Sequence, residues 1–291
     1  MPMHRSIQPS FLLVNADDYG YFPGISRGII DAHTDGIVTA TGVLANGSSF
    51  LEDVDRLRAT TSLDVGVHLN LTFGRPLTAS MRKHHQRSNE KFVSKIDFAK
   101  KYILGELPLD DIHKEWCAQI ELCRDCGLVL WFLNSHEHIH LLPSLFKLTQ
   151  GLSKKYKIPH VRLPTARLFE TLSPAGMIRA AIVRSFAALH RPKNQTAINF
   201  IGFGQSGKLT ESYLMHLIRR MQPGKIYELM CHPGYGADVA KEFDHLRAYH
   251  NWKLEMQTLT SSAIRGMCEE ENVCVIPYRD IGKVTQKQSF V

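Results

Sequence analysis

Long hydrophobic runs are absent from this chain of 291 residues. No apolar stretch approaches the ~20 residues that a membrane-spanning helix needs. The segment Met1 to Ser10 also lacks the apolar core of a secretory signal. These absences predict a soluble, cytoplasmic protein that has no membrane partner.

Cysteine is sparse as well, because six residues are too few for a disulfide scaffold in a chain of this length. We therefore expect reduced thiols. Cys123 and Cys126 have the spacing of a metal or redox motif, but they lie inside the helical pattern Ile112 to Cys126, and no second pair accompanies them. Since buried cysteine behaves as a small hydrophobe, helix packing is the better interpretation.

Strong charge of one sign is also missing, since the formal net charge is a modest +7. The densest basic stretch, Arg82 to Arg87, lies between an expected strand and an expected helix and has no interleaved aromatic residues. Nucleic-acid binding surfaces usually combine the two features. We expect a solvated loop or lid here, and no nucleic-acid partner.

The chain does have a regular alternation of short apolar runs and amphipathic stretches, with 44% hydrophobic residues to build one large α/β domain or two smaller ones. Strands are expected at Phe11–Asn15, Val38–Ala45, Asp64–Asn70, Val129–Asn134, His160–Leu163, Ala197–Phe203, Ile226–Cys231 and Cys274–Tyr278. Helices are expected at Gly24–Asp35, Leu51–Ala59, Ile112–Cys126, Leu145–Tyr156, Leu209–Met221 and Ser261–Glu271.

This alternation predicts a single-domain, distorted parallel β/α barrel of the TIM type over about residues 11–282. An open doubly wound sheet is the alternative, although no glycine-rich dinucleotide motif follows the first strand. The connection from Phe73 to Ile96 is long and charged, which is typical of functional or disordered loops. We expect it to be a mobile cover at the substrate entrance.

The first apolar run stops at two adjacent carboxylates, Asp17 and Asp18, which are followed by Tyr19 and Gly20. Neighbouring residues of an extended strand point to opposite faces. The two carboxylates can therefore share a site only where the strand has ended and the chain turns. A solvated turn is the simpler explanation of such a pair taken alone.

Other reactive residues also lie near the ends of expected strands. His68, His136, Arg162 and His232 each stand at or near the carboxyl end of an expected strand, as do the paired aspartates. Active sites of β/α barrels form at that face. Their joint placement favours a catalytic site over a set of unrelated surface residues.

An aspartate and two histidines would suit a divalent transition ion with open positions for water and substrate, and zinc is the first candidate. His136 belongs to a cluster that also contains His138 and His140. In a strand these three histidines would share one face, whereas in a helix His136 and His140 would do so. Two ligand pairs remain open at this point: His68 with His136, or His136 with His140.

Four separated motifs resemble the YdjC-like carbohydrate deacetylases, a family that includes chitooligosaccharide deacetylase. They are Asn15–Gly20, Gly66–Thr72, Ser135–His140 and Glu228–Tyr235, in the family's order. The resemblance implies a distorted β/α barrel, a divalent ion such as Zn²⁺ or Mg²⁺, and removal of an acetyl group from an N-acetylated sugar. A small carbohydrate is then the expected partner, and a second copy of the chain is a further candidate.

The resemblance also favours Asp18, His68 and His136 as the metal ligands, and it alone distinguishes the ligand Asp18 from the base Asp17. The pair His136 and His140 would match the broader polysaccharide deacetylases. Tyr19 stands where the family often has phenylalanine, a change that alters no ligand.

The residue types support this chemistry independently, because acetamide hydrolysis needs an activated water, a site for the oxyanion and an acid for the amine leaving group. Asp17 could accept the proton of the water, and His232 could donate one to the departing nitrogen. Arg162 could orient Asp17, and Glu228 is a weaker candidate for a partner in the site.

Three other functions fit parts of the pattern: hydrolysis of another amide, non-haem iron oxygen chemistry, and carbohydrate binding without catalysis. The additional acids Asp17 and His232 favour hydrolysis over oxygen chemistry. A silent binding protein would have no need of Asp17 beside a metal ligand.

Overall fold

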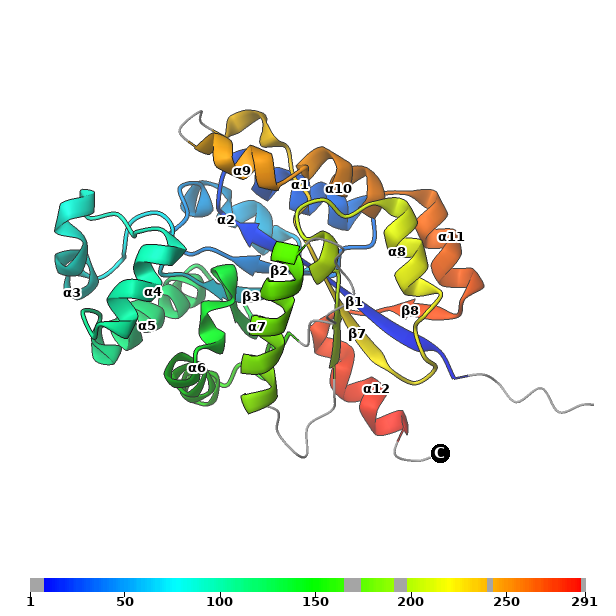
Figure 1. The fold of residues 1–291 in the computed structure, drawn as a ribbon. Helices are drawn as coiled ribbons and strands as arrows, with labels where there is room; N and C mark the ends of the chain where they lie inside the picture. The colour runs from blue at the N-terminus through cyan, green and yellow to red at the C-terminus, as the bar shows by residue number, and fades with distance from the viewer. Residues whose placement is uncertain (1–7, 165–173, 191–197, 240–242, 289–291) are drawn as a thin grey trace, which may run out of the picture.

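In the part of the chain that the structure describes, eight parallel strands form the centre of the protein (Figure 1). The structure is a computed structural model that describes residues 8–164, 174–190, 198–239 and 243–288. Its strands are β1 (Ser10–Tyr19), β2 (Ala40–Val43), β3 (Asp64–Leu69), β4 (Leu130–Ser135), β5 (His160–Val161), β6 (Ile198–Ile201), β7 (Ile226–Cys231) and β8 (Val273–Val275). The order across the sheet is β5-β4-β3-β2-β1-β7-β6, and β8 pairs with the beginning of β1.

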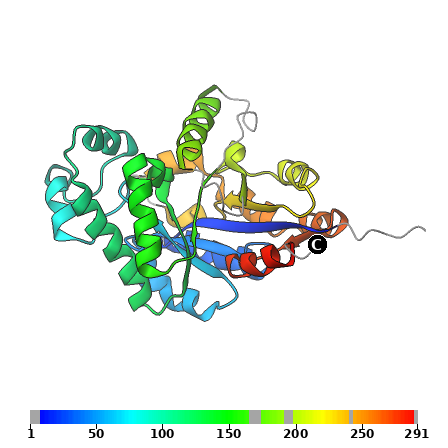
Figure 2. The ribbon, with the colours of Figure 1, turned by 90° about the horizontal axis from the view of Figure 1, so that it is seen from below.

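The sheet curls into a half-barrel with helices around it (Figure 2). Its α-helices are α1 (Pro23–Thr34), α2 (Phe50–Ala59), α3 (Ala79–Arg82), α4 (Lys95–Ile103), α5 (Leu109–Asp125), α6 (Pro143–Tyr156), α7 (Pro174–His190), α8 (Glu211–Ile218), α9 (Asp244–Tyr249), α10 (Trp252–Leu259), α11 (Ser262–Glu270) and α12 (Ile281–Gln288). Short 3₁₀ segments are η1 (Lys83–Ser88), η2 (His136–Leu141), η4 (Phe203–Gln205), η5 (Gly236–Asp238) and η7 (Tyr278–Asp280). Among the described residues the end strands β5 and β6 do not pair. The predicted barrel is therefore confirmed in a distorted, open form.

Every expected strand and helix overlaps an observed one, and the bounds of the first and last strands differ from the expected ones by several residues. The first continues beyond Asn15 to Tyr19. The last ends earlier than expected: Ile276 donates its backbone N–H to Leu12, and Pro277, which has no N–H, ends the ladder. Of the expected strand residues, position 197 lies outside the described residues, as do the first seven residues of the chain.

Side chains of β1 alternate between two cores, as an extended strand requires. Leu12 and Val14 join the large core between the sheet and the helices, whereas Phe11 and Leu13 face the inside of the half-barrel. The buried inner core consists of Phe11, Leu13, Ala40, Phe132, Ile226, Ile276, Tyr278 and Ile281. Because these apolar side chains fill the amino end of the half-barrel, its carboxyl end is left for polar side chains.

The segment Phe73 to Ile96 is folded onto the protein. It contains α3 and η1, and the Glu115 carboxylate of α5 accepts the backbone N–H groups of Leu77 and Thr78, both at 2.9 Å. The prediction of a solvated loop or lid at Arg82 to Arg87 is wrong in its local structure, since these residues end α3 and form most of η1. Their role as a lid stays a prediction. No motif or spacing in the sequence indicates the buried Glu115 that anchors the connection.

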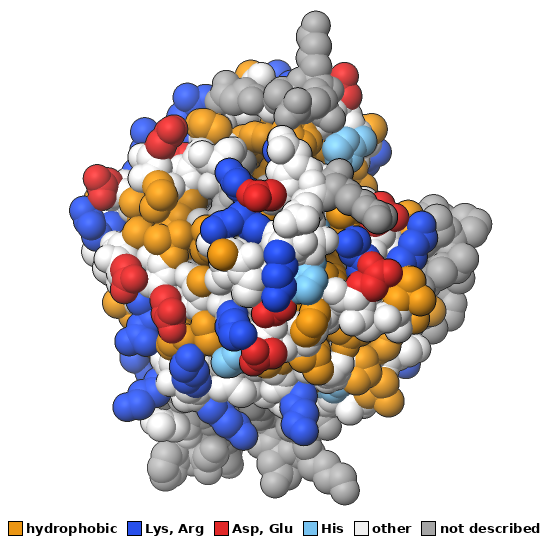
Figure 3. All heavy atoms as spheres, turned by 90° about the vertical axis from the view of Figure 1, so that its left-hand side faces the viewer, with side chains coloured by type: hydrophobic (Ala, Val, Ile, Leu, Met, Phe, Trp, Pro, Cys, Tyr) orange, Lys and Arg blue, Asp and Glu red, His pale blue; other side chains and the backbone are white. Residues whose placement is uncertain are grey.

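The surface over α3, α4 and α5 carries Lys and Arg side chains mixed with Asp and Glu, as Figure 3 shows. This mixture is typical of an ordinary solvated face. The six cysteines are all unpaired, and Cys123 is buried within α5, as the packing interpretation predicted. Within the described ranges, none of the helices has both the length and the apolar character needed to cross a bilayer.

Candidate metal centre and active site

Both aspartates of β1 point into the half-barrel. Continued alternation places Asp17 inward with Leu13, and it would place Asp18 outward. Asp18 instead adopts a left-handed conformation with φ of 78°, and the pairing with β2 shifts between Ala16 and Tyr19. This β-bulge adds one residue to β1 and turns the second carboxylate inward. We expected the strand to end before the two aspartates, but β1 continues to Tyr19. The bulge, and not a turn, brings both carboxylates to the same side.

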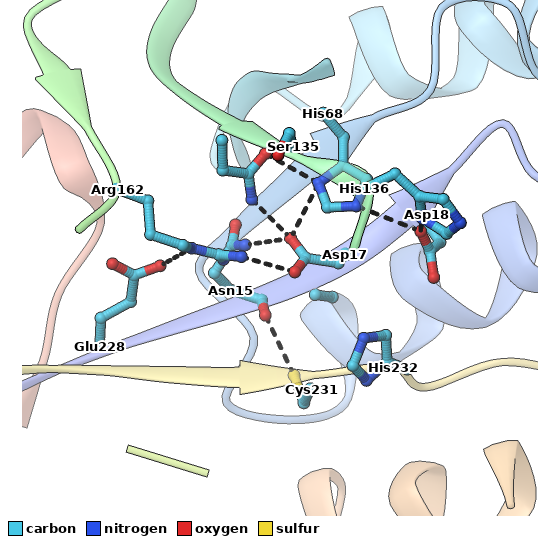
Figure 4. Close-up of polar contacts among 12 residues, drawn as sticks. Asn15, Asp17, Asp18, His68, Ser135, His136, Arg162, Glu228, Cys231 and His232 are labelled. Carbon is cyan, nitrogen blue, oxygen red and sulfur yellow. Dashed lines mark hydrogen bonds and ion pairs between the residues drawn. The ribbon is translucent and has the colours of Figure 1, made fainter. Parts of the chain in front are cut away.

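Asp18, His68 and His136 meet at the carboxyl end of the sheet (Figure 4). One potential ligand atom of each lies within 4.8 Å of the others. The Oδ1 atom of Asp18 is 3.4 Å from His68 Nε2 and 3.1 Å from His136 Nδ1. Asp18 and His68 are buried, and His136 is partly exposed. One carboxylate and two imidazoles form the mixed donor set that divalent transition ions accept.

The hydrogen bonds around His68 test whether these residues fit a cation. The Asp17 carboxylate can only accept, so Asn134 directs its Nδ2 to Asp17 (2.9 Å) and its Oδ1 to His68 Nδ1 (2.8 Å). His68 therefore carries its proton on Nδ1, and the Nε2 lone pair faces the Asp18 oxygen. Burial lowers the pKa of His68, so the ring does not itself supply a positive charge. Two acceptors held this close fit a cation placed between them.

Asp17 belongs to a buried line of charges that continues away from the cluster (Figure 4). Arg162, just after β5, donates Nη1 to Asp17 Oδ2 (2.6 Å) and Nε to Glu228 Oε1 of β7 (2.5 Å). Burial alone would raise the pKa of Asp17, but the positive charge of Arg162 and its hydrogen bond to the carboxylate outweigh burial and lower that pKa to about 2. Asp17 is thus a permanently ionised carboxylate near neutral pH.

The histidine cluster after β4 forms neither a strand nor a regular helix. Glu137 and His138 both have left-handed backbones, with φ of 55° and 56°, inside η2. The turn sends His136 to the ligand cluster and His140 into the core. His140 Nδ1 meets Ser135 Oγ at 2.6 Å, and its Nε2 meets the backbone carbonyl of Arg162 at 3.0 Å. Since both ring nitrogens of His140 are engaged, the geometry favours His68 over His140 as the partner of His136.

His232 extends from the end of β7 and borders the same cavity. Its backbone N–H donates to the buried Glu255 of α10, and its ring centroid is 4.8 Å from that of His250. Burial lowers the pKa of His250 to about 3, with His232 adding to the effect, so His250 is neutral. We did not single out His250 or Glu255 from the sequence, because neither belongs to a motif or follows an expected strand.

A cavity of about 620 Å³ opens over these residues. Asp17, Asp18, His68, His136 and His232 all border it. Most of its other lining is apolar and comes from the following residues: Phe98, Ala99, Ile139, Leu141, Leu142, Val183, Phe186, Phe203, Met230, Leu246 and Tyr249. Polar groups are added by Lys95, Ser135, Glu137, His138, Ser206, His245 and His250. Small-molecule sites commonly have such a volume and such a mixture of apolar walls with a few polar groups.

Comparison with known proteins identifies a family for this chain. The sequence profile of a family described as YdjC-like protein matches residues 11–270. The chain belongs to this family. The match confirms the resemblance that the four motifs indicated.

Relatives in the YdjC-like family include proteins named carbohydrate deacetylase. The one from Geobacillus stearothermophilus is 29% identical over 282 residues, which cover 95% of this chain and 100% of the relative. The one from Clostridium beijerinckii is 28% identical over 272 residues, which cover 93% of this chain and 99% of the relative. The one from Oceanobacillus iheyensis is 40% identical over 147 residues, which are 50% of this chain and 62% of the relative.

The fold has a counterpart among solved structures. A protein from Enterococcus faecalis V583, provisionally described as a cellobiose-phosphate cleavage protein, superposes with a TM-score of 0.73 at 23% identity. The superposition covers 94% of this chain and 99% of that protein. At this level of identity the likeness concerns the fold alone.

Proposed function

We propose that this YdjC-like protein is a metal-dependent carbohydrate deacetylase that hydrolyses the acetamide of an N-acetylated sugar. The observation that carries the proposal is the meeting of Asp18, His68 and His136, with the ionised Asp17 beside them, at the edge of a sugar-sized cavity. The names of the full-length relatives support the reaction. Chitooligosaccharides are the first substrates to test.

Asp18, His68 and His136 would hold the ion, either Zn²⁺ or Mg²⁺. A divalent ion there supplies Lewis acidity, which polarises the acetamide carbonyl and acidifies water, so that a carboxylate as weakly basic as Asp17 suffices. Asn134 keeps the Nδ1 proton of His68 engaged and leaves Nε2 free as a ligand.

Asp17 acts as the general base in this proposal. Its Oδ1 accepts hydrogen bonds from Asn15 (2.7 Å) and Asn134, and its Oδ2 is held by Arg162. These contacts fix the orientation of the carboxylate while it accepts the proton of the attacking water. Arg162 positions Asp17 and keeps it ionised, and Glu228 holds Arg162 from the far side.

His232 acts as the general acid. It directly follows β7, whereas Asp17 lies in β1, so the two groups approach the cavity from different strands. Attack of water on the carbonyl carbon is followed by cleavage of the C–N bond, and His232 delivers a proton to the amine nitrogen. The products are acetate and the free amino sugar.

A screen of N-acetylated mono- and oligosaccharides by mass spectrometry tests the reaction, with metal-free protein and with protein supplied with Zn²⁺ or Mg²⁺. We expect loss of one acetyl group only when an ion is present. Consumption of O₂ with ferrous ion, or binding of sugars without loss of acetyl, would contradict the proposal and favour the oxygenase or the silent binding protein.

The roles of base and acid separate with a leaving group that needs no proton, such as the nitrophenolate of p-nitrophenyl acetate. His232→Gln should lose most activity on the sugar and keep much of it on the ester, because only the amine requires protonation. Asp17→Asn should lose both activities. Equal losses of His232→Gln on the two substrates would show that His232 is not the acid.

A further inference from the structure

Asn134 lies against both the base Asp17 and the metal ligand His68. It is fully buried at the end of β4, and the parallel register pairs it directly with His68 of β3. Its Nδ2 lies 2.9 Å from Asp17 Oδ1, and its Oδ1 lies 2.8 Å from His68 Nδ1. A single amide group therefore contacts both residues at the same time.

The neighbours determine which side chain can serve at this position. On one side is a carboxylate, which only accepts hydrogen bonds, and on the other is an imidazole N–H, which must donate if Nε2 is to bind an ion. The connecting group must therefore donate to Asp17 and accept from His68. An amide does both, whereas a carboxylate can only accept and an aliphatic side chain can do neither.

Gly42 of β2 leaves the space that this arrangement needs. A Cβ atom there would lie 3.0 Å from Asp17 Oδ1, 3.3 Å from Asn134 Oδ1 and 3.3 Å from the Cβ of His68. These separations are tighter than ordinary van der Waals contact for all three side chains. The glycine thus opens the sheet surface at the point where Asp17, Asn134 and His68 converge.

We propose that Asn134 is a positioning residue that couples the two halves of the site: it sets the tautomer of His68 for metal binding and orients Asp17 for proton transfer. This inference rests on the proposed function, since it requires that His68 bind an ion. Partners in the outer shell of a metal site commonly change metal affinity 10- to 100-fold when they are removed.

Asn15 provides a matched control within the same site. Its Nδ2 also donates to Asp17 Oδ1, at 2.7 Å, but its polar contact is with Asp17 and not with His68. Asn15→Leu should therefore reduce turnover while leaving metal affinity unchanged. Asn134→Leu should reduce both, because it removes the acceptor for His68 as well as the donor to Asp17.

Asn134→Asp separates the two contacts further. The aspartate keeps an acceptor for the Nδ1 proton of His68, but it places a second carboxylate against Asp17 where a donor stood. We expect it to retain metal binding and to lose turnover roughly 100-fold or more, the lower range of a general base's contribution. It is also nearly isosteric with asparagine, so it serves if Asn134→Leu fails to fold.

The experiment is a calorimetric titration of metal-free protein with Co²⁺, followed by the visible absorption spectrum of the Co²⁺ form and by deacetylation of the sugar identified in the screen. Circular dichroism melting of the metal-free variants controls for folding. Asn134→Leu should bind Co²⁺ 10- to 100-fold more weakly than wild type, with an altered spectrum, whereas Asn134→Asp and Asn15→Leu should bind it as wild type does.

Wild-type affinity and spectrum in a folded Asn134→Leu would overturn the inference. So would an equal loss of Co²⁺ binding in Asn134→Asp and Asn134→Leu, because the acceptor would then be irrelevant. A wild-type protein that binds no divalent ion would overturn the metal site of the proposed function itself. Failure of the inference on Asn134 and failure of the proposed metal site are distinguishable, because only in the second case does the wild-type protein bind no Co²⁺.

Discussion

Replacing Arg162 with methionine should destabilise the protein strongly at neutral pH. The Arg162 side chain is fully buried between two carboxylates, Asp17 and Glu228. Methionine has a comparable length and no charge, so the substitution leaves these carboxylates buried without a cation. Breaking a buried ion pair by removing one partner costs about 3–5 kcal/mol of unfolding free energy. This is a large fraction of the roughly 5–15 kcal/mol that typical proteins have.

The loss should also depend on pH, through Glu228. Burial raises the pKa of Glu228 above its usual 4.5, and Arg162 opposes that rise. Without Arg162 the pKa rises further, so more of the folded variant carries a neutral Glu228 at mildly acidic pH. When the pKa of a carboxyl group is raised in the folded state, the free energy of unfolding of the protein falls as pH rises through that pKa. The difference between wild type and Arg162→Met should therefore be larger at pH 8 than at pH 5.

Urea unfolding of chelator-treated protein, followed by tryptophan fluorescence, measures this effect without a contribution from metal binding. With a slope of about 3 kcal/mol per molar urea, the midpoint should fall by roughly 1–2 M at pH 8. Glu228→Gln added to Arg162→Met should recover part of the loss, because it removes one of the uncompensated charges. The same difference at both pH values, together with no recovery in the double variant, would show that the uncompensated carboxylates do not cause the destabilisation.

Three further predictions follow from the site. His68→Ala should bind less than stoichiometric Zn²⁺ by metal analysis, whereas His138→Ala should bind as much as wild type; a full metal content in His68→Ala would point to His140 as the ligand instead. Gly42→Ala should unfold about 1–3 kcal/mol more easily, because its methyl crowds Asp17 and Asn134, and an unchanged urea midpoint would contradict that crowding. Burial lowers the pKa of His140 to about 3, so the unfolded chain takes up an additional proton there between about pH 6.5 and 3. Stability should thus fall on acidification by about 1.4 kcal/mol per pH unit for this group, and His140→Gln should show a shallower decline; parallel stability curves would contradict it.

Much of the fold could be predicted because strands and helices alternate with clear hydrophobic periods. The inner and outer faces of β1 follow directly from period-two alternation in Phe11 to Asp17. The bulge at Asp18 could not be predicted, since it depends on how β1 pairs with β2. Similarly, the folded segment after Phe73 depends on Glu115, which lies far along the chain.

In the candidate site, too, some features could be predicted from the sequence and others depend on contacts between distant segments. The positions of Asp17, His68 and His136 at strand ends could be inferred from the sequence, because parallel strands bring their carboxyl ends to one edge. The contacts of Asn134 could not, because they arise from the register between β3 and β4. The left-handed turn at Glu137 and His138 was equally hidden, since non-glycine residues seldom adopt that conformation.

We propose that a single divalent ion, held by Asp18, His68 and His136, makes this protein a deacetylase. Titrating metal-free protein with Zn²⁺, while measuring the rates at which acetate and free amine are released from an N-acetylated sugar, tests this proposal. We expect acetate and amine to be released at equal rates, with activity that reaches its maximum at one ion per chain. Full activity in the metal-free protein, or release of acetate without a matching amine, would contradict it.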